Sequence, residues 1–170
     1  MKEVSKTKAF YNKNAALWSS RKTDSFHHEL TFMKIISLWP EKASIIDIGC
    51  ASGIHVPLFL GMGHKLRYFG IDISKAFLKI ASRRYPTLTF AQGNILEKES
   101  LPKKKFDGFW AAAVLMHVPQ EGWGEMFANI ENLVKSEGHG YLSLPTEHPG
   151  GKITDDTRHF TCLSPEEQVK

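Results

Sequence analysis

The chain has 170 residues, of which 42% are hydrophobic and 24% are charged; these values are typical of one globular domain and exclude a disordered, collagen-like or disulfide-scaffold protein. The net charge of +4 is small, and the dense basic run Lys103 to Lys105 is too short for a nucleic-acid-binding face. The N-terminus is polar, and the two cysteines lack metal or disulfide spacing, which predicts a cytoplasmic protein. No membrane span is predicted, because the sequence lacks a run of about 18 apolar residues.

Two helices are predicted in the first 40 residues. Apolar residues recur between Phe10 and Trp18 at the spacing of an amphipathic helix. The second helix should end before Pro40, because proline cannot continue a helix. The predicted apolar face of this second helix consists of Phe26, Leu30, Met33 and Ile36.

From Ser44 onward, short apolar runs alternate with helical patterns. Ser74 is suited to cap one helix, because its hydroxyl can accept a hydrogen bond from a free backbone N–H, and Pro86 should stop that helix. Residues 123–134 carry a strong amphipathic pattern, which we expect Gly138 to close. The other predicted elements are strands at Ser44–Ile48, Leu66–Ile71, Thr87–Ala91, within Phe106–Val114 and at Gly140–Leu144, and a helix at Ile54–Leu60.

This alternation predicts the fold class. Strands with apolar centres that alternate with helices form a parallel sheet covered on both faces, and right-handed crossovers make such a sheet doubly wound. We therefore predict an α/β, Rossmann-like fold with a mostly parallel sheet in the order 3-2-1-4-5. In such sheets ligands bind beyond the carboxyl ends of the strands, so functional residues should follow the strands directly.

A glycine-bearing loop, Gly49 to Gly53, follows the first predicted strand. Glycine is needed where the backbone turns sharply or where a ligand lies against it without an intervening Cβ. The second strand ends in Asp72, whose carboxylate can accept hydrogen bonds from both hydroxyls of a ribose. Each feature alone has an ordinary explanation, as a tight turn or a helix cap. Together, on adjacent strands, they predict a nucleoside site.

Glycine spacing distinguishes between nucleoside cofactors. Dinucleotide-binding loops have the pattern G-x-G-x-x-G, whose glycines and helix N-terminus hold a pyrophosphate, whereas this loop has the pattern G-x-x-x-G. Asp47 precedes the loop, and its carboxylate suits an ammonium or sulfonium group better than a pyrophosphate. A nicotinamide-dependent dehydrogenase is therefore disfavoured.

Residues 47–53 resemble the first motif of the class I S-adenosylmethionine (SAM)-dependent methyltransferases, usually written D-x-G-x-G-x-G. Ala51 stands in the place of the central glycine of that motif. The resemblance covers roughly Ile45 to Thr146. Further segments resemble the later motifs of the family in the correct order: Phe69–Ser74, Ala91–Ile95, and Phe106–Ala111 followed by Leu115–Val118.

The resemblance implies that the chain binds SAM and releases S-adenosylhomocysteine (SAH). Asp72 would hold the ribose, and Asn94 would contact the adenine amino group. Residues 1–40 resemble the helical lid of small-molecule methyltransferases, over a core of residues 41–170, and Arg21 in that lid could pair with the cofactor carboxylate. The implied cofactor-binding residues are Tyr11, Arg21, Asp47, Gly49, Cys50, Ala51, Gly53, Asp72, Ile73, Asn94, Ile95 and Ala111.

His117 is the candidate general base. It follows the predicted fourth strand, and an imidazole titrates near neutral pH; its alternative role is to cap a helix or pack beneath the lid. A base is required when the acceptor is an alcohol or a phenol, whereas an amine, a thiolate or a carboxylate needs none. The eight histidines show no ligand spacing with cysteines or acids, so no metal site is predicted.

The end of the sequence predicts the start of a helix at Ser164–Glu167, with Ser164 as the cap and proline in the first helical position. The sequence stops at Lys170, whereas members of the resembled family usually continue through two more strands. We therefore expect either a natural or engineered truncation or an unusually short member of the family. Its fifth strand would have an exposed edge, which predicts a homodimer through that edge or disorder in Thr146–Lys170.

The leading hypothesis is a SAM-dependent methyltransferase that acts on a small molecule, without a nucleic-acid or membrane partner. A nucleic-acid or protein methyltransferase is the first alternative, but Ala111–Leu115 lacks the Asp/Asn-Pro-Pro-aromatic motif of base methylases. The second alternative is a non-catalytic or truncated cofactor-binding homologue. Trp18 and Trp110 indicate a flat or hydrophobic acceptor if they lie at the site.

Overall fold

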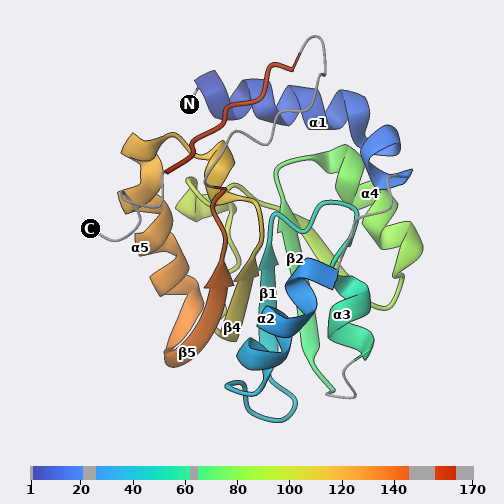
Figure 1. Ribbon diagram of the computed structural model, residues 1–170, viewed down its shortest axis with the longest axis vertical. Coiled ribbons are helices and arrows are strands. Elements are labelled where there is room, and N and C mark those ends of the chain that lie inside the picture. The colour runs from blue at the N-terminus through green and yellow to red at the C-terminus, as the bar shows by residue number, and fades with distance from the viewer. Residues whose placement is uncertain (1, 21–25, 62–64, 146–155, 164–170) are drawn as a thin grey trace.

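A computed structural model describes residues 2–20, 26–61, 65–145 and 156–163 (Figure 1). Arg21 and the predicted helix start at Ser164 lie outside these residues, as does most of Thr146–Lys170. Within the described ranges, no helix has the length and apolar character needed to cross a membrane. The elements are α1 (Lys2–Ser20), α2 (Phe26–Ile36), β1 (Ser44–Ile48), α3 (Val56–Gly61), β2 (Arg67–Asp72), α4 (Lys75–Arg84), β3 (Thr89–Gln92), β4 (Phe106–Ala111), α5 (Trp123–Leu133) and β5 (Val134–Leu142), with short 3-10 turns at Lys98–Ser100, Leu115–His117 and Gln120–Gly122.

The five strands form one sheet in the order β3-β2-β1-β4-β5. Every neighbouring pair is parallel, and β1 lies in the middle. Ile46 of β1 is paired with Phe69 of β2 on one side and with Phe109 of β4 on the other. The winding direction therefore reverses beside β1, and the predicted fold class and strand order are confirmed.

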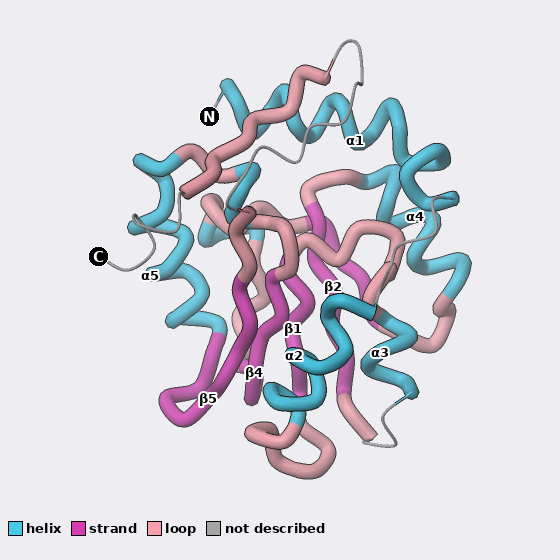
Figure 2. The backbone as a smooth tube through the Cα atoms, in the orientation of Figure 1, coloured by secondary structure: helices cyan, strands magenta, loops and turns pink. Residues whose placement is uncertain are grey.

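Helices cover both faces of the sheet (Figure 2). Ile46 and Ile48 of β1 belong to the same buried cluster as Met126 of α5. Ile45 belongs to a second buried cluster, which includes Phe32 of α2. Because successive side chains of a strand point to opposite faces, β1 is buried on both sides, which explains why its sequence is almost continuously apolar.

Helix α1 lies across the carboxyl ends of the strands (Figure 1). Its Asn12 side-chain oxygen accepts hydrogen bonds from Oγ of Ser74 at 2.9 Å and from the N–H of Ala76 at 3.2 Å, at the start of α4. Near its other end, the backbone oxygen of Ser19 accepts a hydrogen bond from Arg84 of α4 at 2.7 Å. These bonds hold α1 over the end of the sheet where a ligand is expected.

Residues 156–163, which we name the strap, run alongside α1 over the same end of the sheet (Figure 1). The N–H of His159 donates to the Thr7 hydroxyl of α1 at 3.1 Å. The N–H of Thr161 donates to the carbonyl of Met116, in the turn after β4, at 2.7 Å. Helix α1 and the strap, which are distant in sequence, therefore together cover the carboxyl ends of the strands.

The border between α5 and β5 differs from the prediction. Helix α5 ends at Leu133, not at Gly138, and β5 begins directly at Val134. Val134 pairs with Phe106 of β4, and a β-branched residue favours a strand over the end of a helix. Gly138 lies inside β5, where a Cβ would come within 2.2 Å of Val134. This glycine permits a close approach within the sheet and does not close the helix.

Helix α2 buries a different face from the predicted one. Leu30 and Met33 are 70% and 53% exposed, whereas Phe32 and Ile36 are 0% and 3% exposed. The Phe32 ring packs edge-on against Trp110, with 5.4 Å between the ring centroids. The prediction is wrong at Leu30 and Met33 because the helix offers two apolar stripes, and packing against the sheet selects the one that contains Phe32.

The outer edge of β5 pairs with no further strand among the residues that the structure describes. Lys135 and Glu137 are exposed on this strand, and charged side chains on an edge strand disfavour pairing with another chain. These charges count against the predicted homodimer through this edge, which stays a prediction.

Candidate active site

A cavity of about 340 Å³ lies beneath α1, at the carboxyl ends of the strands. The loop after β1, the end of β2 and the loop after β4 line it, together with residues of α1 and the strap. Its wall is mostly apolar, as is typical of small-molecule sites. Within the described residues, no group of His, Cys, Asp and Glu side chains could hold a metal ion. The side chains with hydrogen-bonding groups in the wall are Thr7, Tyr11, Trp18, Ser52, Asp72, Asn94, His117 and Arg158.

Three residues with left-handed backbone shape the loop after β1. Gly49, Ala51 and Gly53 have φ angles of 72°, 48° and 76°. The N–H of Gly49 donates to the carbonyl of Ile71 at 2.8 Å, which ties the loop to the end of β2. A Cβ on Gly49 would lie 2.4 Å from Val114, so glycine is required there. Ala51 adopts a left-handed conformation that costs a non-glycine residue about 1 kcal/mol.

Asp72 ends β2 with its carboxylate in the cavity wall. One carboxylate oxygen accepts a hydrogen bond from the N–H of Ser74 at 2.7 Å, and the other accepts one from the N–H of Ala51 at 2.9 Å. Burial raises the pKa of Asp72 to about 6, although hydrogen bonds from backbone N–H groups lower it. Each oxygen keeps further lone-pair capacity, so the carboxylate can accept two hydroxyl groups from a ligand.

Ile73, Asn94 and Ile95 line the cavity at the ends of β2 and β3. Nδ2 of Asn94 donates to Glu97 at 2.9 Å, and its Oδ1 accepts a hydrogen bond from the N–H of Leu96 at 3.1 Å. This Asx turn holds the amide in place, and the second lone pair of Oδ1 can still accept a hydrogen bond. The three residues can offer apolar faces and one polar edge to a flat ring.

Asp47 is buried in β1 and is not part of the cavity wall. Its Oδ2 accepts a hydrogen bond from the Tyr68 hydroxyl at 2.7 Å, whereas Oδ1 has no partner among the described residues. Burial raises the pKa of Asp47 to about 7; the Tyr68 bond lowers it and the nearby Asp72 raises it. A buried carboxylate with an unused oxygen favours positive charge nearby.

Asp47→Asn is expected to remove part of the pH dependence of folding stability. The pKa of Asp47 is about 7 in the folded chain, against the ordinary value of 3.8 for an aspartate, so its contribution to stability is present at low pH and is lost as the pH rises from about 4 to about 7. Asparagine keeps an oxygen for the Tyr68 hydroxyl but cannot ionise. In urea denaturation without cofactor, the free energy of unfolding of the variant relative to the parent should rise by about 2–3 kcal/mol between about pH 5 and about pH 8. The same difference at both pH values would contradict this expectation.

Besides Asp47, three predicted cofactor residues lie behind the cavity wall. Cys50 is fully buried, and Gly53 faces Tyr85, whose ring would lie 2.8 Å from a Cβ. Ala111 is buried at the end of β4, and the wall begins with the next residue, Ala112. These positions can shape the site without touching a ligand.

The two tryptophans singled out in the sequence have different surroundings. Trp18 of α1 lines the cavity. Trp110 is 0% exposed and stacks on Tyr141, with 4.2 Å between the ring centroids. Trp110 therefore belongs to the core, and only Trp18 of the two can contact an acceptor.

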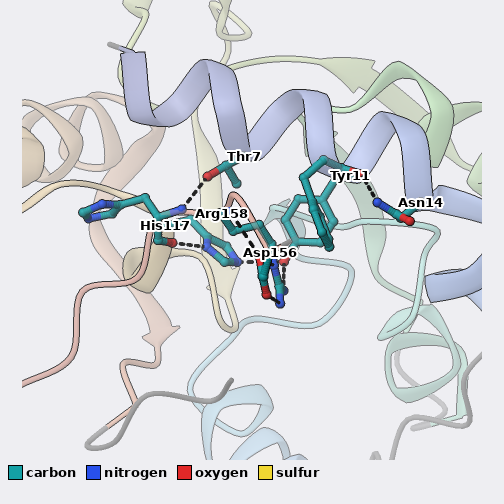
Figure 3. A network of polar contacts seen from close by, with 8 residues as sticks. Thr7, Tyr11, Asn14, His117, Asp156 and Arg158 are labelled. Atoms are coloured by element: carbon teal, nitrogen blue, oxygen red, sulfur yellow. Dashed lines mark hydrogen bonds and ion pairs between the residues drawn. The ribbon is translucent and has the colours of Figure 1, made fainter. Parts of the chain in front are cut away.

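His117 lies in the turn after β4, and its imidazole joins three segments of the chain (Figure 3). Nε2 lies 2.8 Å from the Tyr11 hydroxyl of α1, and Nδ1 lies 2.7 Å from the backbone oxygen of His159 in the strap. Burial lowers the pKa of His117 to about 4, the bond to His159 raises it, and the charge of Arg158 lowers it. The imidazole is therefore neutral at neutral pH, and its unprotonated nitrogen can accept a hydrogen bond.

Arg158 of the strap is a cavity residue whose side chain is 4% exposed. Its Nη1 donates to the Tyr11 hydroxyl at 2.9 Å, and its Nε donates to Asp156 at 2.8 Å (Figure 3). Because Asp156 compensates its charge, the guanidinium can stay buried. The guanidinium also lies 4.6 to 5.4 Å from the ring centroids of Phe10, Tyr11, Trp18 and Phe160.

The sequence does not single out Arg158 as a site residue. It lies in a segment without helical or strand periodicity, and 147 positions separate it from Tyr11. The one local signal is Asp156, an acid two positions before Arg158. An acid at this spacing from an arginine also occurs in many surface turns. A contact across this sequence distance becomes visible in the folded chain, where the strap lies beside α1.

Solved structures of similar fold contain SAM or related ligands. DhpI in complex with SAH is 16% identical to this chain, with a TM-score of 0.70 and coverage of 98% of this chain and 84% of that one. The glycopeptide N-methyltransferase MtfA, solved with sinefungin, is 15% identical, with a TM-score of 0.63 and coverage of 74% and 56%. Magnesium protoporphyrin IX methyltransferase from Synechocystis PCC 6803, with bound SAM, is 18% identical, with a TM-score of 0.59 and coverage of 78% and 72%. At these identities the likeness establishes the fold.

A comparison with curated proteins found no match to the chain. The sequence model of the methyltransferase-domain family matches residues 45–138, which is more than half of the chain. The matched segment contains the loop after β1, Asp72 and His117, and it confirms the resemblance seen in the motifs. The chain therefore belongs to the methyltransferase-domain family and has the fold of the class I SAM-dependent methyltransferases.

Proposed function

We propose that this methyltransferase takes its methyl group from SAM and transfers it to a small molecule. The observation that carries the proposal is the Asp72 carboxylate, which two backbone N–H groups hold in the cavity wall beside the glycine-bearing loop. A ribose is the part of SAM that presents two neighbouring hydroxyls to such a carboxylate. When bound there, SAM supplies a methyl group activated by its sulfonium and is converted to SAH.

The rest of the cavity wall fits the other parts of SAM. Ile73 and Ile95 would bound the adenine, with Asn94 at its edge. Gly49 would leave room for the methionine end, because this position has no Cβ. Oδ1 of Asp47, which is buried and has no hydrogen-bond partner in the described part of the chain, would favour the positive charge of that end.

Five other predicted residues fall into two groups. Cys50, Gly53 and Ala111 would act indirectly, because they support the loop and the strand from behind the wall. Tyr11 and His117 we assign to the acceptor side, because they bond to each other in the cavity wall.

A small acceptor is supported by the way the cavity is covered. Helix α1 and the strap lie over it, and we propose that residues 1–40 act as a lid on a core of residues 41–170. Trp18 and Phe160 in the wall suit a flat or hydrophobic acceptor. A second structure of DhpI, which aligns with this chain at 15% identity, is a complex with SAM and HEP, so this fold can hold SAM together with a second ligand.

Two measurements test the proposal. Isothermal titration calorimetry with SAH should give saturable one-site binding to the parent protein, and NAD should give none. SAH release from SAM should then be stimulated by a low-molecular-mass metabolite fraction and not by RNA or protein fractions. Absence of SAH binding would contradict the cofactor assignment, and stimulation by RNA or protein alone would contradict the small-molecule assignment.

A further inference from the structure

The hydrogen positions around Tyr11 follow from its hydrogen-bond partners (Figure 3). The backbone carbonyl of His159 can only accept, so Nδ1 of His117, 2.7 Å away, carries a hydrogen. Since burial lowers the pKa of His117 to about 4, the ring is neutral and Nε2 has a lone pair. The Tyr11 hydroxyl, 2.8 Å from Nε2, therefore donates to it.

The Tyr11 oxygen keeps one lone pair for a ligand. Its other lone pair accepts a hydrogen bond from Nη1 of Arg158 at 2.9 Å. Tyr11 and His117 both line the cavity. A group in the cavity that donates to Tyr11 would thus join a chain of hydrogen bonds that ends on a neutral imidazole.

We propose that Tyr11 and His117 form a proton relay that serves a hydroxyl acceptor, so that the chain is an O-methyltransferase acting on phenols, enols or alcohols. This inference rests on the proposed function. The acceptor hydroxyl donates to the oxygen of Tyr11, the proton of Tyr11 moves to Nε2 of His117, and the acceptor proton replaces it. The carbonyl of His159 holds the ring in the required tautomer throughout.

Atoms and charge balance in this scheme. The acceptor oxygen forms the new C–O bond to the methyl group while the C–S bond of SAM breaks and its electron pair stays on sulfur. The acceptor loses one proton, and His117 gains one. The resulting imidazolium releases this proton to solvent after the product has left. The overall reaction converts the SAM cation and a hydroxyl compound into SAH, a methyl ether and a proton.

Arg158 and Asp156 position Tyr11, and their charges compensate each other beside it. Arg158 holds the Tyr11 oxygen by a hydrogen bond, and Asp156 binds the guanidinium through Nε at 2.8 Å. Since Asp156 compensates the positive charge of Arg158, the wall beside Tyr11 offers an anionic acceptor no net positive charge. A neutral hydroxyl is the acceptor that needs a base, whereas an amine or a thiolate attacks without one. The compensated charge of Arg158 and the neutral His117 thus point to the same acceptor class.

Nitrogen NMR on the full chain with ¹⁵N-labelled histidine tests the relay without turnover. His117, identified by the loss of its signals in His117→Asn, should be the neutral Nδ1–H tautomer between about pH 6 and about pH 8. Tyr11→Phe should shift the Nε2 resonance, because the donor is lost. Asn14→Ala on the same helix should leave it unchanged, because the Asn14 side chain bonds to the backbone of Phe10, away from the cavity wall. A cationic His117 or a hydrogen on Nε2 in the parent would overturn the relay.

Turnover is measured as SAH release with phenols of graded acidity, aliphatic alcohols, amines and thiols. Tyr11→Phe and His117→Asn should each lower kcat about 100-fold with un-ionised phenols. The dissociation constant of SAH should change by less than about threefold. The loss in kcat should shrink for phenols that are already ionised at the assay pH, since these bring no proton. His117→Asn keeps an N–H that can reach the carbonyl of His159, which separates loss of the base from loss of the strap contact.

The outcomes distinguish this inference from the proposed function. If the parent fails to bind SAH, the proposed function itself is wrong. If SAH binds but turnover is confined to amines or thiols, or no compound of the panel is methylated, the hydroxyl assignment is overturned. An equal loss of kcat with ionised and un-ionised phenols in both variants would overturn the relay.

Discussion

Asp72→Ala is expected to weaken the binding of SAH by at least about 100-fold. A hydrogen bond to a charged group contributes about 1.5–3 kcal/mol, and the carboxylate would accept two from the ribose. The loss of about 3–6 kcal/mol exceeds a factor of 100 in affinity, since each 1.4 kcal/mol is about tenfold. Alanine also removes the acceptor for the N–H groups of Ala51 and Ser74, so the loop after β1 loses one of the bonds that hold it to β2, whereas the bond from Gly49 to Ile71 remains. Calorimetry with SAH measures the effect.

Two further variants separate ligand binding from folding. Asp72→Asn keeps one accepting oxygen and should give an intermediate loss of affinity. Asp107→Asn is the matched control at the opposite end of the sheet, where Asp107 accepts hydrogen bonds from the N–H of Ser44 at 2.7 Å and from Lys135 at 2.6 Å. This variant should lower the free energy of unfolding and leave SAH affinity unchanged. Unaltered affinity in Asp72→Ala would show that the ribose does not bind at Asp72.

Gly49→Ala is expected to destabilise the fold by about 2–4 kcal/mol and to weaken SAH binding by more than about tenfold. Part of the cost, about 1–2 kcal/mol, arises because alanine disfavours the left-handed backbone observed at φ 72°. The rest arises because the new Cβ would lie 2.4 Å from Cγ2 of Val114, and Val114 is stiff about its first side-chain dihedral angle. Urea denaturation and calorimetry measure the two effects.

The double variant Gly49→Ala/Val114→Ala tests this division. Removing the valine methyl groups relieves the clash, so about half of the lost stability should return, whereas the backbone strain should remain. Val114→Ala alone is the control, with an expected change of about 1 kcal/mol or less, because Val114 is only half-buried. Complete recovery in the double variant, or no recovery, would refute one of the two causes.

Local patterns in the sequence were sufficient for much of the fold. Ser74 caps α4 as predicted, with its Oγ accepting a hydrogen bond from the N–H of Phe77 at 3.3 Å. The loop after β1 and the carboxylate of Asp72 meet at the predicted edge of the sheet. Caps, turns and strand alternation depend on residues close in sequence, and the right-handed crossover rule then leaves few ways to order the strands.

The same patterns could not decide which side chains share the cavity. Asp47 and Gly49 belong to one motif, yet the Asp47 carboxylate turns towards Tyr68 while Gly49 lines the cavity. In α2 two apolar stripes were available, and contact with the sheet selected the one that contains Phe32. Side-chain direction and helix rotation depend on packing partners that are distant in sequence.

The sequence by itself determined the strand–helix order, the glycine-bearing loop and the acid at the end of β2, because these rest on short-range chemistry. Only the tertiary structure brought Tyr11 to His117, 106 positions away, and to Arg158, 147 positions away. Those contacts arise because α1 and the strap cross the same end of the sheet, an arrangement that depends on how complete elements pack and not on the spacing of residues within any one of them.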